Sequence, residues 1–251
     1  MTLLHTILTA ALAALSGSAI AAPAMGPVRN VVLVHGAFAD GSGWKPVADI
    51  LRKDGYTVSI VQEPETSLAD DIAATNRILD RQTGPAVLVG HSYGGAIITE
   101  AGNNPNVASL VYVAAFAPDE GESLGALTAS DPPAATSIAP TKDGYLLIDE
   151  AKFQADFAAD LPESNAKFLA ISQVPINASI FATPVMGAAW KVKPSFGIVA
   201  TQDRMINPDL QRSMYQRAKA QVSEVKGSHA IFLSQPRAVA DVIERAANAS
   251  K

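Results

Sequence analysis

Cysteine is absent from the 251 residues of this chain. Disulfide bonds, thiolate metal sites and a cysteine nucleophile are therefore excluded, although the absence fits an oxidising or a reducing compartment equally well. Charged residues are sparse, at 17% of the sequence with a formal net charge of −5, and no stretch gathers Lys and Arg. Nucleic acids and anionic membrane surfaces are therefore not expected partners.

Aromatic residues are also few, at 6%, yet hydrophobic residues make up 48% of the chain. That balance is typical of a compact globular protein and argues against a disordered chain. The length is ordinary for one α/β domain with a substantial core. No internal repeat is visible, and no linker is long enough to separate two domains.

The N-terminal segment has the pattern of a secretory signal peptide. An apolar stretch covers residues 7–15, and small residues follow up to the tripeptide A-I-A at 19–21, which fits an A-x-A cleavage site. The usual Lys or Arg near the start is missing, and an ordinary N-terminal helix is the alternative. The apolar stretch is too short to span a bilayer. We expect removal of residues 1–21 and a single exported domain at 22–251, periplasmic or extracellular.

Strand-like and helix-like segments alternate from Val28 onward. The expected strands cover residues 28–36, 56–64, 85–90, 107–116, 194–201 and 220–227. The expected helices cover residues 44–55, 67–84, 93–104, 208–220 and 235–249. Strands that alternate with helices predict right-handed crossovers, and therefore an α/β fold with a doubly wound, mostly parallel sheet.

The alternation stops at about residues 117–193, after the strand that ends near Phe116. This stretch contains several Pro and Gly, short helix-like pieces and dispersed aromatic residues. We expect a helical lid insertion that covers a site at the carboxyl ends of the strands. Its aromatic and methionine side chains predict an apolar lining: Phe153, Phe157, Phe168, Phe181, Met186 and Trp190. With Phe38, the last three of these are the expected substrate-binding residues.

The stretch "VLVGHSYGGA" contains the pattern G-x-S-x-G around Ser92. The bare pattern is common by chance, and close packing of a strand and a helix could also explain its glycines. An apolar strand immediately before and a helical stretch immediately after are much less common, and they are the setting of a nucleophile elbow. This context predicts that Ser92 is a nucleophile held above the sheet.

A serine nucleophile needs a base, and the chain offers only four histidines. His5 lies in the expected signal segment, His35 ends the first strand, and His91 adjoins the serine and should point to the other side of the turn. His229 follows the last expected strand, from where a loop can bring its imidazole to Ser92. We therefore expect His229 to be the general base.

The base needs an acidic partner that fixes its tautomer and stabilises the imidazolium. Asp203 follows an expected strand and lies between the serine and the histidine in the sequence, which gives the order Ser, Asp, His. Asp119 follows another strand and is the rival candidate. The backbone N–H groups of Tyr93 and Ala37 are the expected oxyanion donors, because Gly36 lets the backbone approach closely.

Four segments, "VLVHGAF", "LVGHSYGG", "ATQDRMINP" and "VKGSHAIFLSQP", together resemble the α/β-hydrolase fold superfamily. They are most similar to its small serine esterase branch, which includes plant methyl esterases, hydroxynitrile lyases and bacterial relatives. The resemblance covers about residues 28–247. It implies Ser92 as nucleophile, His229 as base and Asp203 as orienting acid, with Ala37 and Tyr93 as backbone donors.

Two departures count against a lyase. The plant lyases of this branch have threonine where this chain has Gly36, and a lysine where it has Ala230. A serine nucleophile also disfavours the dehalogenase and epoxide-hydrolase branches, which use aspartate.

The sequence thus predicts a serine hydrolase that cleaves a carboxylic ester of an apolar, uncharged small molecule through an acyl-enzyme on Ser92. The alternatives are acyl transfer or perhydrolysis on the same serine, and a non-catalytic small-molecule binder. No cofactor and no metal site are expected, since neither a dinucleotide fingerprint nor a set of metal ligands is present. The sequence leaves the oligomeric state open.

Overall fold

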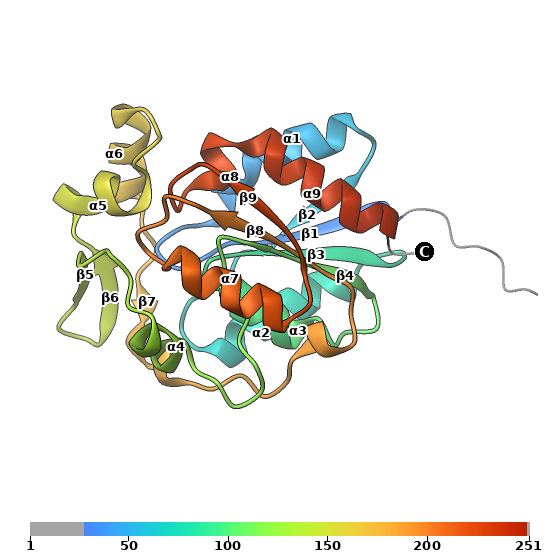
Figure 1. Ribbon diagram of the computed structural model, residues 1–251, viewed down its shortest axis with the longest axis horizontal. Coiled ribbons are helices and arrows are strands. Elements are labelled where there is room, and N and C mark those ends of the chain that lie inside the picture. The colour runs from blue at the N-terminus through green and yellow to red at the C-terminus, as the bar shows by residue number, and fades with distance from the viewer. Residues whose placement is uncertain (1–27, 250–251) are drawn as a thin grey trace, which may run out of the picture.

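The computed structural model describes residues 28–249, so the predicted signal peptide at residues 1–21 lies outside the described residues. Six parallel strands form the main sheet in the order β2-β1-β3-β4-β8-β9 (Figure 1). They are β1 (Asn30–Val34), β2 (Thr57–Ile60), β3 (Ala86–His91), β4 (Val107–Val113), β8 (Ser195–Ala200) and β9 (Gln221–Val225). The predicted doubly wound, mostly parallel sheet is confirmed.

Helices cover both faces of this sheet (Figure 1). On one face lie α1 (Lys45–Lys53), α8 (Ile231–Ser234) and α9 (Pro236–Ala249), with the 3-10 turn η1 (Gly41–Trp44) before α1. The other face carries α2 (Leu68–Leu79), α3 (Gly94–Ala101) and α7 (Pro208–Arg217). Successive β1 residues alternate between two cores, because Val31 and Leu33 pack with the α1 and α9 side chains whereas Val32 and Val34 pack on the opposite face. Burial on both faces explains why the inner strands β1, β3, β4 and β8 are mostly apolar, unlike the edge strands β2 and β9.

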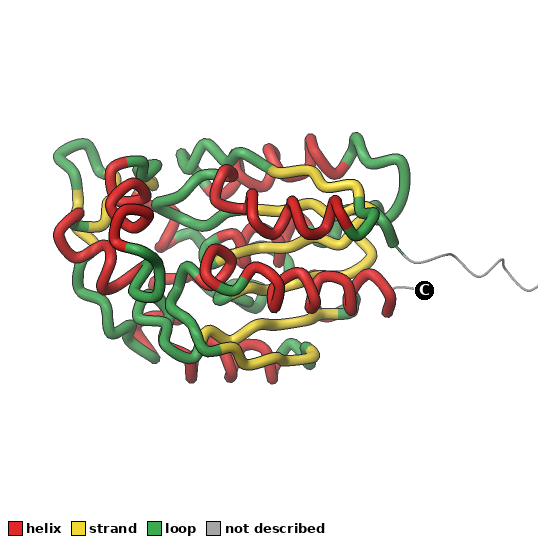
Figure 2. The backbone as a smooth tube through the Cα atoms, turned by 90° about the horizontal axis from the view of Figure 1, so that it is seen from above, coloured by secondary structure: helices red, strands yellow, loops and turns green. Residues whose placement is uncertain are grey.

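The stretch between β4 and β8, which we call the insert (residues 117–193), is only partly helical. Its helices are α4 (Leu124–Ser130), α5 (Glu150–Phe157) and α6 (Glu163–Ile171), with 3-10 turns η2 (Ala178–Ala182) and η3 (Ala189–Lys191). It also contains a three-stranded antiparallel sheet of β5 (Ile138–Pro140), β6 (Tyr145–Ile148) and β7 (Ile176–Asn177), which the helical prediction missed. These strands are too short to show a period of two residues in the sequence. Figures 1 and 2 place α4–α6 and this small sheet together at one end of the main sheet.

Candidate active site

Ser92 lies on a sharp turn between β3 and α3, with a backbone φ of 54°. That left-handed conformation is rare for a residue with a side chain and is strained. The neighbouring glycines permit it, because a Cβ atom on Gly90 would lie 2.5 Å from the Gly94 carbonyl oxygen, and one on Gly94 would lie 2.3 Å from the His35 carbonyl oxygen. The packing and the nucleophile interpretations of this turn are therefore compatible.

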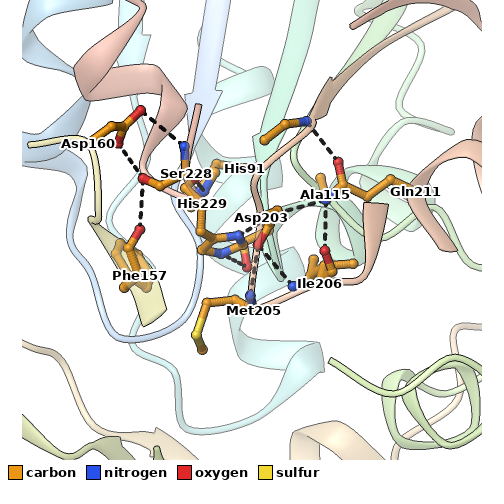
Figure 3. Close-up of polar contacts among 12 residues, drawn as sticks. His91, Ala115, Phe157, Asp160, Asp203, Met205, Ile206, Gln211, Ser228 and His229 are labelled. Atoms are coloured by element: carbon orange, nitrogen blue, oxygen red, sulfur yellow. Dashed lines mark hydrogen bonds and ion pairs between the residues drawn. The ribbon is translucent and has the colours of Figure 1, made fainter. Parts of the chain in front are cut away.

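The structure brings together the three side chains predicted for a catalytic triad. The Nε2 atom of His229 lies 2.9 Å from the Ser92 Oγ atom. Its Nδ1 atom lies 2.8 Å from Oδ2 of Asp203 (Figure 3). All three residues are buried. The Asp203 carboxylate can only accept a hydrogen bond, so Nδ1 of a neutral His229 carries the ring proton. Nε2 is then free to accept the hydroxyl proton of Ser92.

The Asp203 carboxylate is held by donors on every side. Its Oδ1 atom accepts the backbone N–H groups of Met205 at 2.8 Å and Ile206 at 3.0 Å (Figure 3). Its Oδ2 atom accepts Nε2–H of Gln211 at 2.8 Å as well as the Nδ1–H of His229. Hydrogen bonds to a buried carboxylate stabilise its charged form, which is the form that can stabilise an imidazolium.

His91 contacts His229 through a hydrogen bond and through its ring. The Nε2–H of His91 donates to the backbone carbonyl oxygen of His229 at 3.0 Å, and the two rings lie 4.7 Å apart. Burial lowers the pKa of His91 well below its usual range, so this histidine is neutral. The ring of Phe157 meets that of His229 edge-on at 4.9 Å. These contacts fix the orientation of the imidazole.

The two predicted oxyanion donors lie beside Ser92 and line the same cavity. Ala37 belongs to the loop after β1, and Tyr93 is the residue immediately before α3. Among the described residues, no protein acceptor receives the backbone N–H of Ala37 or of Tyr93. Both groups are therefore available to an anion that forms next to Ser92.

A cavity of about 380 Å³ opens on Ser92 and His229. Residues that follow the main strands and residues of the insert line it together. The lining is mostly apolar: Ala37, Phe38, Tyr93, Phe116, Gly125, Thr128, Ala129, Pro133, Ile138, Leu146, Phe181, Met205 and Ile206. Apart from Ser92 and His229, its polar side chains are those of Thr128 and Tyr93.

Two of the four predicted substrate-binding residues line this cavity and two do not. Phe38 and Phe181 lie in its wall. Met186 does not line it: its side chain is exposed and its backbone N–H donates to Glu100. Trp190 does not line it either, because its ring is buried elsewhere and its Nε1–H donates to the Pro118 carbonyl oxygen at 2.8 Å.

The other aromatic residues of the insert do not line the cavity either. Phe153 and Phe157 are buried and stack on each other at 4.8 Å, and Phe168 is exposed on α6. The rival acid Asp119 forms an ion pair with Lys191 at 2.5 Å and is not the residue that bonds His229. Within residues 28–249 no cluster of His, Asp or Glu has the arrangement of a metal site, and none of the described helices is long and apolar enough to cross a bilayer.

Comparison with known proteins agrees with this geometry. Residues 31–242 match the model of the alpha/beta hydrolase family. The chain belongs to this family. The match spans the nucleophile elbow, the insert and both partners of Ser92.

Two curated relatives are enzymes that bear hydrolase names. A carbendazim hydrolyzing esterase from Nocardioides sp. (strain SG-4G) is 36% identical over an alignment of 115 positions, and the alignment covers 40% of this chain and 47% of that esterase. A pyrethroid hydrolase from Sphingobium wenxiniae is 28% identical over an alignment of 252 positions, and the alignment covers 88% of this chain and 89% of the relative. The fold is also that of a methylesterase from Arabidopsis, with a TM-score of 0.72 at 19% identity over 87% of this chain and 98% of that one. Family and relatives support an esterase-type hydrolase.

Sequence reasoning missed the residues that hold the triad in place. Gln211 is a buried polar residue of α7 that lies among the buried Leu210, Met214 and Tyr215, and its place on an apolar helix face was the available signal. Gln211 also accepts the backbone N–H of Ala200 at 3.2 Å, which ties α7 to the end of β8. A buried polar side chain in such a place needs partners, and here the partner is Asp203.

Proposed function

We propose that this chain is a serine hydrolase that cleaves a carboxylic ester of an apolar, uncharged small molecule through an acyl-enzyme on Ser92. The observation that carries the proposal is the pair of contacts at His229, 2.9 Å to Ser92 and 2.8 Å to Asp203, at the base of an apolar cavity. Relatives named as an esterase and a hydrolase support the same reaction class.

In the first half of the reaction, the Ser92 Oγ atom attacks the ester carbonyl carbon while His229 Nε2 takes the hydroxyl proton. The carbonyl oxygen becomes an oxyanion and accepts the N–H groups of Ala37 and Tyr93. Asp203 keeps its charge and stabilises the imidazolium through Nδ1. The tetrahedral intermediate then collapses, the C–O bond to the alcohol breaks, and His229 returns the proton to the leaving oxygen.

In the second half, water attacks the acyl-enzyme carbonyl carbon and gives a proton to His229. The same two N–H groups stabilise the second oxyanion. Collapse of this intermediate breaks the ester bond to Ser92, whose Oγ atom regains its proton from His229. The products are a carboxylic acid and an alcohol, and the serine is restored.

The cavity supports an apolar and uncharged substrate. Its volume, about 380 Å³, lies near the lower end of the usual range for ligand pockets, about 300–1,000 Å³. No Lys, Arg, Asp or Glu side chain is among its lining residues. A charged acyl or alcohol group would lose its hydration there without gaining a partner.

The test measures hydrolysis of p-nitrophenyl esters from acetate to decanoate by the wild type and by Ser92→Ala. We expect the wild type to turn over the shorter esters and Ser92→Ala to lose at least about 10³-fold in kcat. Ser109→Ala is the matched control, since Ser109 is a buried serine on β4 that does not line the cavity. It should keep wild-type rates.

A fluorophosphonate probe should label the wild type once per chain and should not label Ser92→Ala. A wild type that shows no turnover on any ester and resists the probe would contradict the proposal, and tight ligand binding without turnover would favour the binder. Acyl transfer would instead appear as ester or peracid products when an alcohol or peroxide competes with water.

We also propose that the protein is exported, on the strength of the apolar stretch and A-I-A tripeptide in residues 7–21. N-terminal sequencing of the mature protein from a secreting host should then start at Ala22. A mature chain that retains residues 1–21 inside the cell would contradict export.

A further inference from the structure

Five buried polar residues form a cluster behind the two oxyanion donors. His35 follows β1, Glu63 and Glu65 follow β2, Asp71 lies on α2, and Tyr93 precedes α3. Each of these residues is at most 6% exposed. The strand order β2-β1-β3 places the three loops side by side at the carboxyl edge of the sheet. The mechanism proposed above uses none of the side chains in this cluster.

Asp71 joins the loop after β2 to the start of α3. Its Oδ2 atom accepts the phenol hydroxyl of Tyr93 at 2.5 Å, and its Oδ1 atom accepts the backbone N–H of Glu65 at 2.9 Å. The side chain of Tyr93, whose backbone N–H faces the site, is therefore anchored at its far end. Because both carboxylate oxygens have a donor, Asp71 can remain charged although it is buried.

Glu65 carries the connection on to the loop after β1. Its carboxyl group faces the backbone N–H of Phe38, and its Oε1 atom lies 3.6 Å from Nδ1 of His35. The same Nδ1 atom lies 3.0 Å from the carbonyl oxygen of Gly36, and Nε2 of His35 contacts the Glu63 carboxyl group. Residues on both sides of Ala37 are therefore in contact with the cluster.

Three residues of these loops have left-handed backbones, with φ values of 65° at Phe38, 55° at Glu65 and 54° at Ser92. Such a conformation is strained for a residue with a side chain and persists only where its surroundings enforce it. The cluster contacts each of the three loops. It is therefore in place to hold the loop conformations that carry Ala37 and Tyr93.

The charges of the cluster are compatible with this arrangement. Burial, together with the nearby Asp71 and Glu63 carboxylates, raises the pKa of Glu65 to about 10, so Glu65 is neutral at pH 7. Burial also raises the pKa of Glu63, and the Glu63 carboxyl group raises the pKa of His35 against the opposite effect of burial. Burial raises the pKa of Asp71 as well, and the hydrogen bonds from Tyr93 and Glu65 oppose that rise.

We propose that Asp71 and Glu65 are positioning residues of the oxyanion hole: the path Tyr93–Asp71–Glu65–Phe38 links the two segments that carry its donors. This inference rests on the proposed ester hydrolysis at Ser92. A donor that is out of place stabilises the oxyanion less and leaves the binding of the ester almost unchanged. Damage to the cluster should therefore lower kcat and leave KM nearly unchanged.

The first test uses Tyr93→Phe, which removes only the hydroxyl and keeps the backbone donor. Removal of a whole oxyanion donor costs about 10²–10³ in kcat, so a displaced one should cost less, about 10-fold, with KM within about twofold. Asp71→Asn should cost at least as much. Tyr112→Phe is the matched control, because Tyr112 is a buried tyrosine whose hydroxyl pairs with Thr99, away from both donor loops. It should keep the wild-type kcat.

The second test uses the pH profile of Glu65 variants. Deprotonation of Glu65 would place a second negative charge against Asp71 on α2, beside Glu63 of its own loop, His35 after β1 and Tyr93 before α3. The wild type should therefore lose kcat as pH rises towards about 10, after subtraction of the spontaneous rate. Glu65→Gln has no proton to lose and should match the wild type at pH 7 yet keep its kcat at pH 10. Glu65→Leu, which removes the carboxyl group beside Phe38 and His35, should lose kcat at both pH values.

Failure of this inference differs from failure of the proposed function. If the wild type hydrolyses esters, Ser92→Ala does not, and the cluster variants match the wild type in kcat and in pH profile, the positioning role is wrong and the hydrolase stands. If the variants raise KM rather than lower kcat, the cluster shapes the substrate pocket and the inference is overturned. A wild type without any serine-dependent turnover would refute both.

Discussion

At the scale of single residues, the site consists of buried polar groups that have found partners. Asp203 receives four donors, and His229 is fixed at both ring nitrogens and at its carbonyl oxygen. A buried group without such partners costs about 1–3 kcal/mol, or more if it is charged. The hydrogen bonds therefore decide which tautomer and which orientation each catalytic group adopts.

Asp203→Asn should show this dependence. The amide is the same size as the carboxylate, but its NH₂ group cannot accept hydrogen bonds. It would therefore point an N–H at one of the groups that donate to Asp203 in the wild type. We expect kcat to fall about 10³–10⁴-fold, because the imidazole loses both its tautomer and its counter-charge. Ester hydrolysis at saturating substrate measures it. Asn substitution of the rival Asp119 is the control, and a larger loss there would contradict the assignment of Asp203.

Glu65→Gln should also change stability, separately from its effect on activity. The folded chain holds a proton on Glu65 from the ordinary carboxyl pKa of 4.5 up to about 10, whereas the unfolded chain releases it above 4.5. The folded state thus binds more protons in this window, so the free energy of unfolding falls as pH rises through it, by at most about 1.4 kcal/mol per pH unit. Urea unfolding at about pH 6 and pH 9 should show a smaller fall for the variant than for the wild type. An equal fall in the free energy of unfolding for the two proteins would mean that Glu65 is ionised in the folded protein.

At the scale of the elements, the close approach of α3 to the ends of the strands holds Ser92 in place. Gly95 faces the β4 end so closely that a Cβ atom would lie 2.0 Å from the Phe116 carbonyl oxygen and 2.8 Å from the Ala115 Cβ atom. Backbone atoms cannot move aside as a flexible side chain can. The helix would have to shift, and Ser92 would shift with it.

Gly95→Ala should therefore cost about 1–3 kcal/mol of stability as an overpacked site and lower esterase activity as well. For a domain of this size, that corresponds to a fall in Tm of about 2–4 °C per kcal/mol. Thermal unfolding and ester turnover check both effects. Gly84→Ala is the control, because the nearest atom to its Cβ would be an Asn30 side-chain nitrogen at 3.6 Å. Equal Tm values for the two variants would show that α3 accommodates the methyl group.

At the scale of the whole molecule, two parts of different character meet at the cavity. The main sheet supplies Ser92, Asp203 and His229 from loops after β3, β8 and β9, and the insert supplies seven of the fifteen residues that line the cavity. Because parallel strands end at the same edge, residues far apart in the sequence meet there. The proposed triad thus comes from the sheet, whereas nearly half of the cavity lining comes from the insert.

Phe181→Ala should widen the cavity without touching the triad. We expect the acyl-length optimum to move to longer chains, with kcat/KM for the longest accepted esters raised at least about 10-fold. A series of p-nitrophenyl esters measures it. Phe168→Ala removes a phenylalanine from the same insert at an exposed site on α6 and should leave the optimum unchanged. An optimum that moves with Phe168 instead would place the acyl group outside this cavity.

Local sequence patterns were enough to predict the α/β architecture and the spatial proximity of Ser92, Asp203 and His229. Buried parallel strands are apolar throughout, and the helices between them are amphipathic, so local patterns suffice to find them. Each of the three residues follows a strand, and the geometry of a parallel sheet then brings the strand ends together. This is why motif order alone predicted their proximity, with Ala37 and Tyr93 beside them.

The tertiary structure was needed to find which insert residues face the cavity and which side chains hold Ser92, Asp203 and His229 in place. The insert has no long periodic segment, so its composition could not separate Phe181, which lines the cavity, from Met186 and Trp190, which do not. Gln211 and the Asp71–Glu65 cluster could not be predicted either. A polar residue that looks exposed in the sequence is recognised as buried only when its contacts with other elements are known. Long-range packing, rather than local preference, makes these choices.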